Sequence, residues 1–140
     1  METVVTISNF LILVLIIIAP ILILIILKRL KTKRTVIIYS LIGLSVLGIL
    51  IVIFAWWSHE SDLILLKHYG YNIDGMNETE FFGNVLAENL DTVKRLETSI
   101  MGIGWPVKAM FGFVMTIPYL IFVYIGKVLI DRIMIKKNEA

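Results

Sequence analysis

The sequence predicts an all-α integral membrane protein with three transmembrane helices and an extracytoplasmic amphipathic helix between helices two and three. Hydrophobic residues make up 59% of the 140 residues and charged residues only 17%. Soluble domains are about 45–50% apolar and about 25% charged. Nearly all of the charged residues lie outside three long apolar stretches, and each of these stretches is long enough to span a bilayer.

The first predicted span covers residues 7–27. No charged residue occurs between Thr3 and Leu27. A helix over residues 7–27 would be about 30 Å long, which matches the hydrocarbon core of a bilayer. A signal peptide is disfavoured because Glu2 precedes the apolar run and no Lys or Arg does.

The second and third spans are predicted at residues 35–57 and at about 105–130. Residues 35–57 carry no charge, and Lys108 is the one charge between Gly102 and Gly126. Backbone N–H and C=O groups have no partner in lipid, so both spans must be helical. We expect Lys108 to extend its ammonium to the membrane surface rather than to act inside the bilayer.

Lys and Arg predict the orientation. The short loop 28–34 is dense in basic residues, and more of them follow the third span in the tail 131–140. The segment 58–101 is rich in Asp and Glu instead. The positive-inside rule therefore predicts a multi-pass plasma-membrane protein with its N-terminus outside and its C-terminus in the cytoplasm. The basic residues concerned are Lys28, Arg29, Lys31, Lys33, Arg34, Lys127, Arg132, Lys136 and Lys137.

The outer segment 58–101 is predicted to contain one amphipathic helix. Asn77 or Thr79 can cap its N-terminus, and apolar residues then recur every three or four positions up to Ile100. Three partners could cover this stripe: the Leu63–Leu66 patch, the bilayer surface or another protein. The stripe consists of Phe82, Leu86, Leu90, Val93, Leu96 and Ile100.

Small residues predict where the second and third spans touch. Lipid tails are as apolar as leucine, so membrane helices associate where small side chains let their backbones approach. Together with Val52 in the second span and with Tyr119 and Val123 in the third, such residues recur every three or four positions. We expect the two faces to meet within one chain or between copies. The candidate packing residues are Ser45, Gly48, Ala55, Ala109, Gly112, Thr116 and Gly126.

Chemistry-bearing motifs are scarce. The sequence has no cysteine, and it lacks nucleotide-binding and nucleophile-elbow motifs. His59, Asp62 and His68 could in principle bind zinc, but their spacing on a helix does not bring all three together. We therefore expect no catalytic, metal or cofactor-binding site and no cofactor. We also expect no nucleic-acid partner, because the net charge is only +2.

The function expected from these observations is protein–protein interaction by a non-enzymatic accessory, regulatory or immunity-type membrane subunit. Its partners would be the lipid bilayer and another membrane or extracytoplasmic protein, including a second copy of this chain. The alternative is an oligomeric pore or holin-like or transport-associated protein, for which Ser45, Lys108, Thr116 and Tyr119 are the few polar residues available. The candidate partner-binding residues are Phe82, Leu86, Leu90, Val93, Glu80, Glu88 and Asp91.

Overall fold

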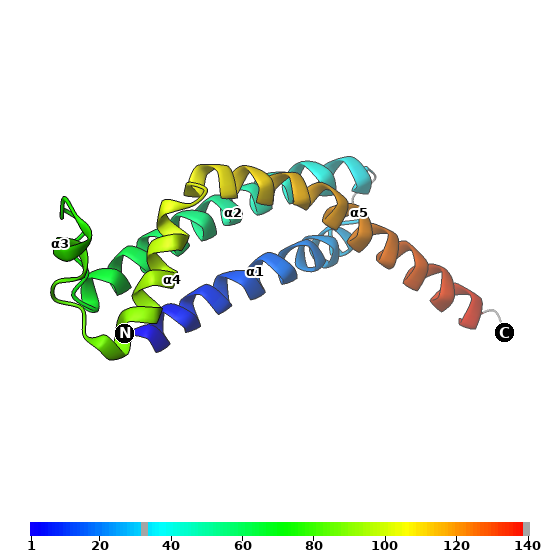
Figure 1. Cartoon of the computed structure of the whole chain (residues 1–140). Coiled ribbons are helices and arrows are strands. Elements are labelled where there is room, and N and C mark those ends of the chain that lie inside the picture. The colour runs from blue at the N-terminus through cyan, green and yellow to red at the C-terminus, as the bar shows by residue number, and fades with distance from the viewer. Residues whose placement is uncertain (32–33, 139–140) are drawn as a thin grey trace. The chain divides into compact units, whose positions relative to one another are not determined.

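A computed structural model describes residues 1–31 and 34–138, with side chains up to residue 134 (Figure 1). Lys33 of the basic loop and the side chains of Lys136 and Lys137 lie outside the described part. The described chain is all-helical, and three of its helices are long and apolar enough to cross a membrane. The elements are α1 (Glu2–Arg29), α2 (Thr35–His68), α3 (Glu78–Phe82), the 3-10 helix η1 (Ala87–Asn89), α4 (Leu90–Met101) and α5 (Trp105–Asn138).

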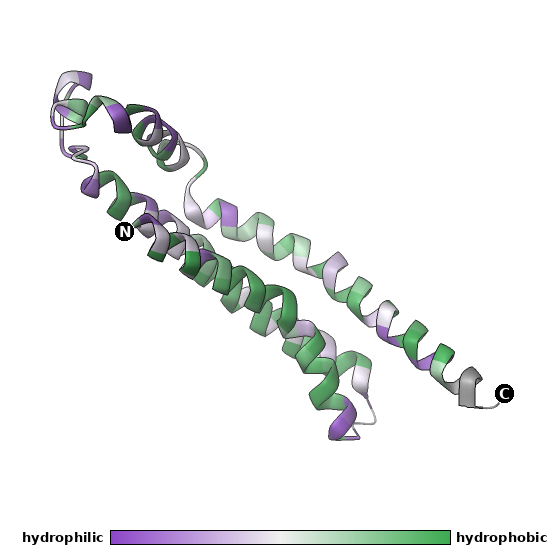
Figure 2. Cartoon of the chain, turned by 90° about the horizontal axis from the view of Figure 1, so that it is seen from below, coloured by the Kyte–Doolittle hydropathy of each residue, from purple (hydrophilic) through white to green (hydrophobic). Residues whose placement is uncertain are grey.

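The long helices extend beyond the predicted spans. α1 begins at Glu2, and α2 continues through residues 58–68 as one helix of 34 residues. At about 1.5 Å per residue α2 is about 51 Å long, more than a bilayer core requires. Ser58 marks a change in polarity but not a helix end, because neither Gly nor Pro follows it before Gly70. Figure 2 shows hydrophobic residues along most of the helix that starts at the N-terminus, while the short helices between α2 and α5 are mixed.

The prediction of one continuous amphipathic helix from its cap at Asn77 or Thr79 to Ile100 is wrong. α3 ends at Phe82, residues 83–86 are not helical, and a new helical segment starts at Ala87. Gly83 and Asn84 have low helix propensity, and together they interrupt the helix. The 3.6-residue repeat of apolar residues continues across this break, so the spacing alone does not reveal it.

The chain packs as two compact units, each built from parts of several helices. Unit 1 comprises Met1–Leu11 and Val52–Ala109, and unit 2 comprises Ile12–Ile51 and Met110–Ala140. The core of unit 1 joins the start of α1, the end of α2 and α4. Its buried residues are Val5, Leu65, Leu66, Tyr71, Val93 and Leu96.

Unit 2 is a three-helix arrangement whose core comes from α1, α2 and α5. Two tyrosines donate hydrogen bonds to backbone carbonyls of neighbouring helices. Tyr119 Oη lies 2.6 Å from the Ile17 oxygen, and Tyr39 Oη lies 3.3 Å from the Leu120 oxygen. These bonds satisfy the hydroxyl groups while their rings pack against apolar residues. The buried core residues are Ala19, Ile23, Leu24, Leu27, Tyr39, Leu47 and Leu120.

Glycines let α2 and α5 approach closely within unit 2. A Cβ atom on Gly112 would lie 2.8 Å from Ile51 Cγ2, and one on Gly48 would lie 3.1 Å from the Phe113 ring. Gly43 packs against Leu120 in the same way, although the small-residue pattern did not include it. Both glycines predicted for this seam, Gly48 and Gly112, therefore lie in the contact.

The remaining candidate packing residues are placed differently. Thr116 is buried, and its hydroxyl donates to the Phe113 oxygen of its own helix at 2.6 Å. Ser45 is exposed and donates to the Leu41 oxygen. A Cβ on Gly126 would have no atom within 4 Å. In unit 1, the candidates Ala55 and Ala109 are both buried.

The close approach at Gly112 yields a testable prediction. Gly112→Ala should lower the free energy of unfolding by about 1–3 kcal/mol, because the added methyl group overpacks the contact. Ile51 cannot easily move aside, since a β-branched side chain in a helix has one strongly preferred rotamer. Thermal unfolding in detergent, followed by circular dichroism, measures the change.

Gly126→Ala is the matched control, because its new methyl group meets open space. It should unfold at the wild-type temperature or slightly above it, given the higher helix propensity of Ala. Equal destabilisation by the two substitutions would contradict the close contact between Gly112 and Ile51.

Candidate functional site

The candidate site lies in the part of unit 1 that connects α2 to α5, and a turn after α2 sets its geometry. Gly70 has φ +84°, and the Tyr71 N–H donates to the Leu66 oxygen across the helix end. This is the arrangement in which a left-handed glycine ends a helix and an apolar residue follows it. A Cβ on Gly70 would lie 2.5 Å from the Asn84 oxygen, so glycine is required here for space as well as for φ.

Tyr71, placed by this turn, connects the end of α2 with α3 and α4. Its ring stacks on Phe81 with centroids 5.6 Å apart and meets the edge of Phe82 at 5.3 Å. Its hydroxyl donates to Glu97 Oε1 at 2.6 Å. Burial and this hydrogen bond raise the pKa of Tyr71 to about 12. Tyr71 therefore holds α3 and α4 to the end of α2.

The apolar stripe of the outer segment is divided between core and surface. Val93 is 0% exposed and packs with Leu65, Leu66 and Leu96. The Leu63–Leu66 patch therefore covers the α4 part of the stripe, which was the first of the three alternatives. Val93 is thus unavailable to a partner, whereas Leu86 is 62% exposed.

Phe82 and Leu90 are half-buried and line a pocket between α3 and α4, which we name the α3–α4 pocket. Its volume is about 410 Å³, and Glu78 and Lys94 contribute charges of opposite sign to it. Leu86 lies in the connection between the two helices that form this pocket. The lining thus combines apolar side chains with polar and charged ones, as binding pockets do. The lining residues are Glu78, Thr79, Phe82, Gly83, Leu90 and Lys94.

The three candidate acidic residues have different roles. Glu80 is part of the α3 N-cap: its carboxylate accepts from the Met76 N–H and from Asn77 Nδ2, both at 2.9 Å. Asn77 Oδ1 in turn accepts from the Glu80 N–H, so Asn77 is the capping residue. Glu88 and Asp91 are exposed, and neither carboxylate forms a hydrogen bond or ion pair within residues 1–31 and 34–134. Of the three candidate acidic residues, these two are therefore free to meet a partner.

Two further polar groups hold α4 to its neighbours rather than facing a ligand. Ser99 Oγ donates to Asp62 Oδ2 at 2.8 Å. Lys108 Nζ, expected to extend to the membrane surface, donates to the Ser99 oxygen at 3.1 Å. The ammonium of Lys108 therefore satisfies a carbonyl in the last turn of α4, which is left without an intrahelical partner.

Among the described residues, no three His, Asp or Glu side chains lie close enough together to hold a metal ion. His59, Asp62 and His68 all belong to α2, and Asp62 accepts its hydrogen bond from Ser99. The described residues of the site thus offer a pocket and exposed side chains for binding.

Comparison of the chain with protein-family models, with curated proteins and with solved structures finds no match. The function is therefore inferred from the geometry and charge of the chain's own residues.

Sequence reasoning predicted a turn over residues 70–77 but did not assign Gly70, Tyr71 or Lys94 to the site. A signal for the first two was present, because a glycine followed by an aromatic residue just after a polar helical turn is typical of a helix C-terminus. Lys94 had no such signal, since its contribution to the α3–α4 pocket depends on the break at residues 83–86.

The Tyr71–Glu97 hydrogen bond predicts a pH-dependent stability. Tyr71→Phe keeps the ring contacts and removes the hydroxyl, so it should lower the free energy of unfolding by about 1 kcal/mol at neutral pH. Because the pKa of Tyr71 is higher in the folded state than its ordinary value of 10, the wild type loses this advantage as the pH rises from 10 towards 12. Chemical unfolding of both proteins in detergent at pH 7, 10 and 11 measures the difference, which should shrink at high pH. A pH-independent difference would contradict the role given to the hydroxyl.

Proposed function

We propose that this chain is a non-enzymatic membrane protein that binds another protein through the α3–α4 pocket and the exposed Leu86. The observation that carries the proposal is the combination of a pocket of about 410 Å³ with an adjacent leucine that is 62% exposed. Clustered exposed apolar side chains rimmed by polar residues are typical of protein interaction sites. Accessory, regulatory and immunity-type subunits are the classes of protein that fit this role.

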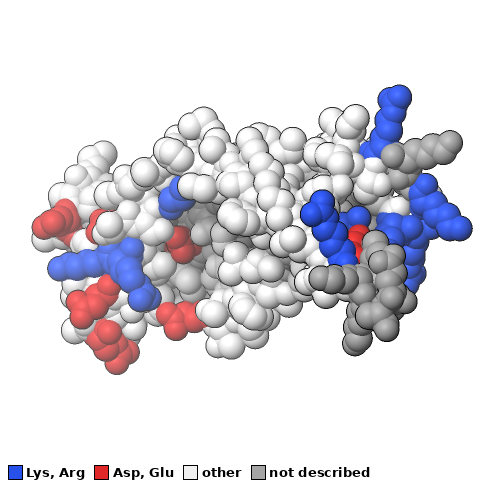
Figure 3. All heavy atoms as spheres, turned by 90° about the vertical axis from the view of Figure 1, so that its right-hand side faces the viewer, with Lys and Arg blue, Asp and Glu red and all other residues white. Residues whose placement is uncertain are grey.

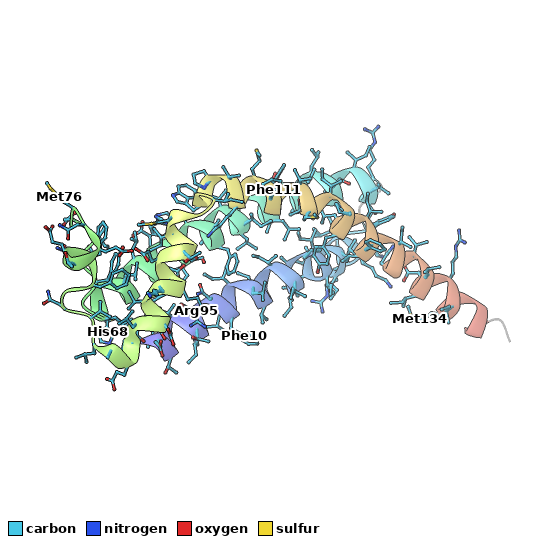
Figure 4. All side chains as sticks on the ribbon, in the orientation of Figure 1. Phe10, His68, Met76, Arg95, Phe111 and Met134 are labelled. Carbon is cyan, nitrogen blue, oxygen red and sulfur yellow. The ribbon has the colours of Figure 1, made fainter. Side chains whose placement is uncertain are left out.

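The exposed carboxylates close to Leu90 in the sequence indicate what the partner must offer. Glu88 and Asp91 are exposed and lie on either side of the half-buried Leu90 in the sequence. A complementary partner would insert an apolar side chain against Phe82 and Leu90 and place a Lys or Arg next to these carboxylates. Met76, which is 91% exposed and points away from the ribbon in Figure 4, adds an adaptable apolar contact on the same connecting segment.

The proposal includes the orientation derived from the sequence: a plasma-membrane protein with its N-terminus outside and the segment after α2 outside as well. Basic residues concentrate in the loop after α1, and acidic residues concentrate between α2 and α5. This distribution supports the orientation because Lys and Arg resist translocation. The partner would then be an extracytoplasmic protein or the outer part of a membrane protein.

Pore formation has less support. The polar groups that could line a pore already bond to backbone carbonyls of this chain: Ser45 to Leu41, Thr116 to Phe113, Tyr119 to Ile17 and Lys108 to Ser99. A hydroxyl or ammonium engaged in this way offers less to a permeating ion or solute.

A cross-linking experiment tests the partner-binding proposal. A photo-reactive amino acid replaces Leu86 in the full-length protein in its native membrane, and cross-linked species are identified by mass spectrometry. We expect one predominant protein adduct from position 86. Adding Leu90→Ser and Glu88→Lys to the same chain should reduce this adduct about tenfold or more, because hot-spot residues typically contribute 2 kcal/mol or more.

Ile103 provides the matched control, because it is also an exposed apolar residue of unit 1 but does not line the pocket. The same photo-reactive group at position 103 should not yield that adduct. If position 86 yields only lipid adducts, or if positions 86 and 103 yield the same proteins, the proposed surface is not a partner site.

A further inference from the structure

Unit 2 contains an apolar groove between α1 and α5, and three charged residues stand at one end of it. The groove has a volume of about 410 Å³. Leu24 and Ile25 of α1 line it on one side, and Val123, Gly126 and Ile130 of α5 line it on the other. Lys28, Lys127 and Asp131 line it as well. We name this feature the α1–α5 groove.

Gly126 keeps the groove open. A Cβ at this position would find no atom within 4 Å, so glycine is not required here by close packing. In the middle of a helix, glycine is less favourable than alanine. The missing side chain therefore leaves room for something other than this chain's described residues.

The three charged residues form one connected group. Asp131 lies between the two lysines, with Oδ1 3.2 Å from Lys28 Nζ and Oδ2 2.9 Å from Lys127 Nζ. The group thus carries a net charge of +1. An ammonium has three N–H donors, and each lysine uses one of them on Asp131, so both retain donors for an anion. Figure 3 shows most of the basic side chains gathered at the right of the view, with a small acidic patch among them.

The accessibility and position of these lysines match a membrane boundary. The side chain of Lys28 is 65% exposed, and Lys28 belongs to the last turn of α1, immediately before the basic loop. From Phe10 to Leu27 the preceding residues of α1 carry no polar side chain. The groove therefore runs from the apolar part of the helix to the level where lipid headgroups lie.

We propose that the α1–α5 groove binds an anionic phospholipid, with one acyl chain against Leu24, Val123 and Gly126 and the phosphate at Lys28 and Lys127. Basic pockets between transmembrane helices are a recognised type of anionic-lipid site. The net charge of +1 complements a singly charged phosphodiester such as phosphatidylglycerol. Asp131 positions both ammonium groups at the end of the groove. This site is separate from the α3–α4 pocket and does not depend on the function proposed for it.

Lipid titration of the full-length protein in neutral detergent tests the proposal. Native mass spectrometry counts bound phosphatidylglycerol and phosphatidylcholine at equal concentrations, and thermal unfolding is measured with each lipid and with inorganic phosphate. We expect phosphatidylglycerol to bind more tightly and to raise the unfolding temperature, while phosphatidylcholine does so weakly and inorganic phosphate does not. Equal binding of the two lipids, or the same stabilisation by inorganic phosphate, would overturn the proposal.

Two variants test separately how the two lysines and the apolar groove contribute to lipid binding. K28Q/K127Q should weaken phosphatidylglycerol binding about tenfold or more, at about 1 kcal/mol per basic residue. G126L fills the groove but keeps both lysines, and it should weaken binding to a similar extent without loss of helical content. K67Q, which removes an exposed lysine of unit 1 that lines neither the α1–α5 groove nor the α3–α4 pocket, is the matched control and should bind as the wild type does. Wild-type binding by both K28Q/K127Q and G126L would place the lipid elsewhere and refute the site.

Discussion

The segment between α2 and α5 depends on the burial of one side chain, Tyr71. The left-handed turn at Gly70 directs it into the core of unit 1, where its ring contacts Phe81 and Phe82 and its hydroxyl bonds to Glu97. A five-residue helix such as α3 has almost no stability of its own. These contacts allow α3 and α4 to form a pocket, because each helix is held to the end of α2 through the same tyrosine.

Unit 2 is held together differently. Its helices are apolar on most faces, and apolar burial between helices is worth little when the surroundings are lipid. Close packing and hydrogen bonds must then provide the stability. Gly48 and Gly112 allow the close packing. The hydroxyls of Tyr119 and Tyr39 form the hydrogen bonds, to the carbonyl oxygens of Ile17 and Leu120 respectively. A chain of 59% hydrophobic residues can in this way hold defined helix contacts with few polar groups.

Much of the fold was accessible from the sequence, since apolar runs of membrane length can only be helices in lipid. The small-residue repeat identified Gly48 and Gly112, and Asn77 was one of the two predicted caps. The continuation of α2 to His68 was missed because polarity was read as a helix boundary, although helix formation depends on backbone propensity and packing. The break at Gly83 was missed because the apolar repeat on either side remained in phase.

The candidate site was predicted only in part, because the spacing of residues does not show which side chains tertiary packing buries. Spacing assigned Val93 and Leu86 to the same stripe, but tertiary packing buries Val93 against Leu65 and Leu66 and leaves Leu86 exposed. Glu80 could not be distinguished from Glu88 by sequence, because its role in the cap depends on where α3 begins. Which residues face a partner is decided by contacts between distant segments.

The central claim is that the α3–α4 pocket faces the outside of the cell, where a partner can reach it. The chain has no native cysteine, so single-cysteine labelling in intact cells measures this directly. Thr79→Cys, at a residue that lines the pocket, should react with a membrane-impermeant maleimide in intact cells. Thr32→Cys, in the basic loop, should react only after permeabilisation. The reverse pattern would place the pocket in the cytoplasm and contradict the account.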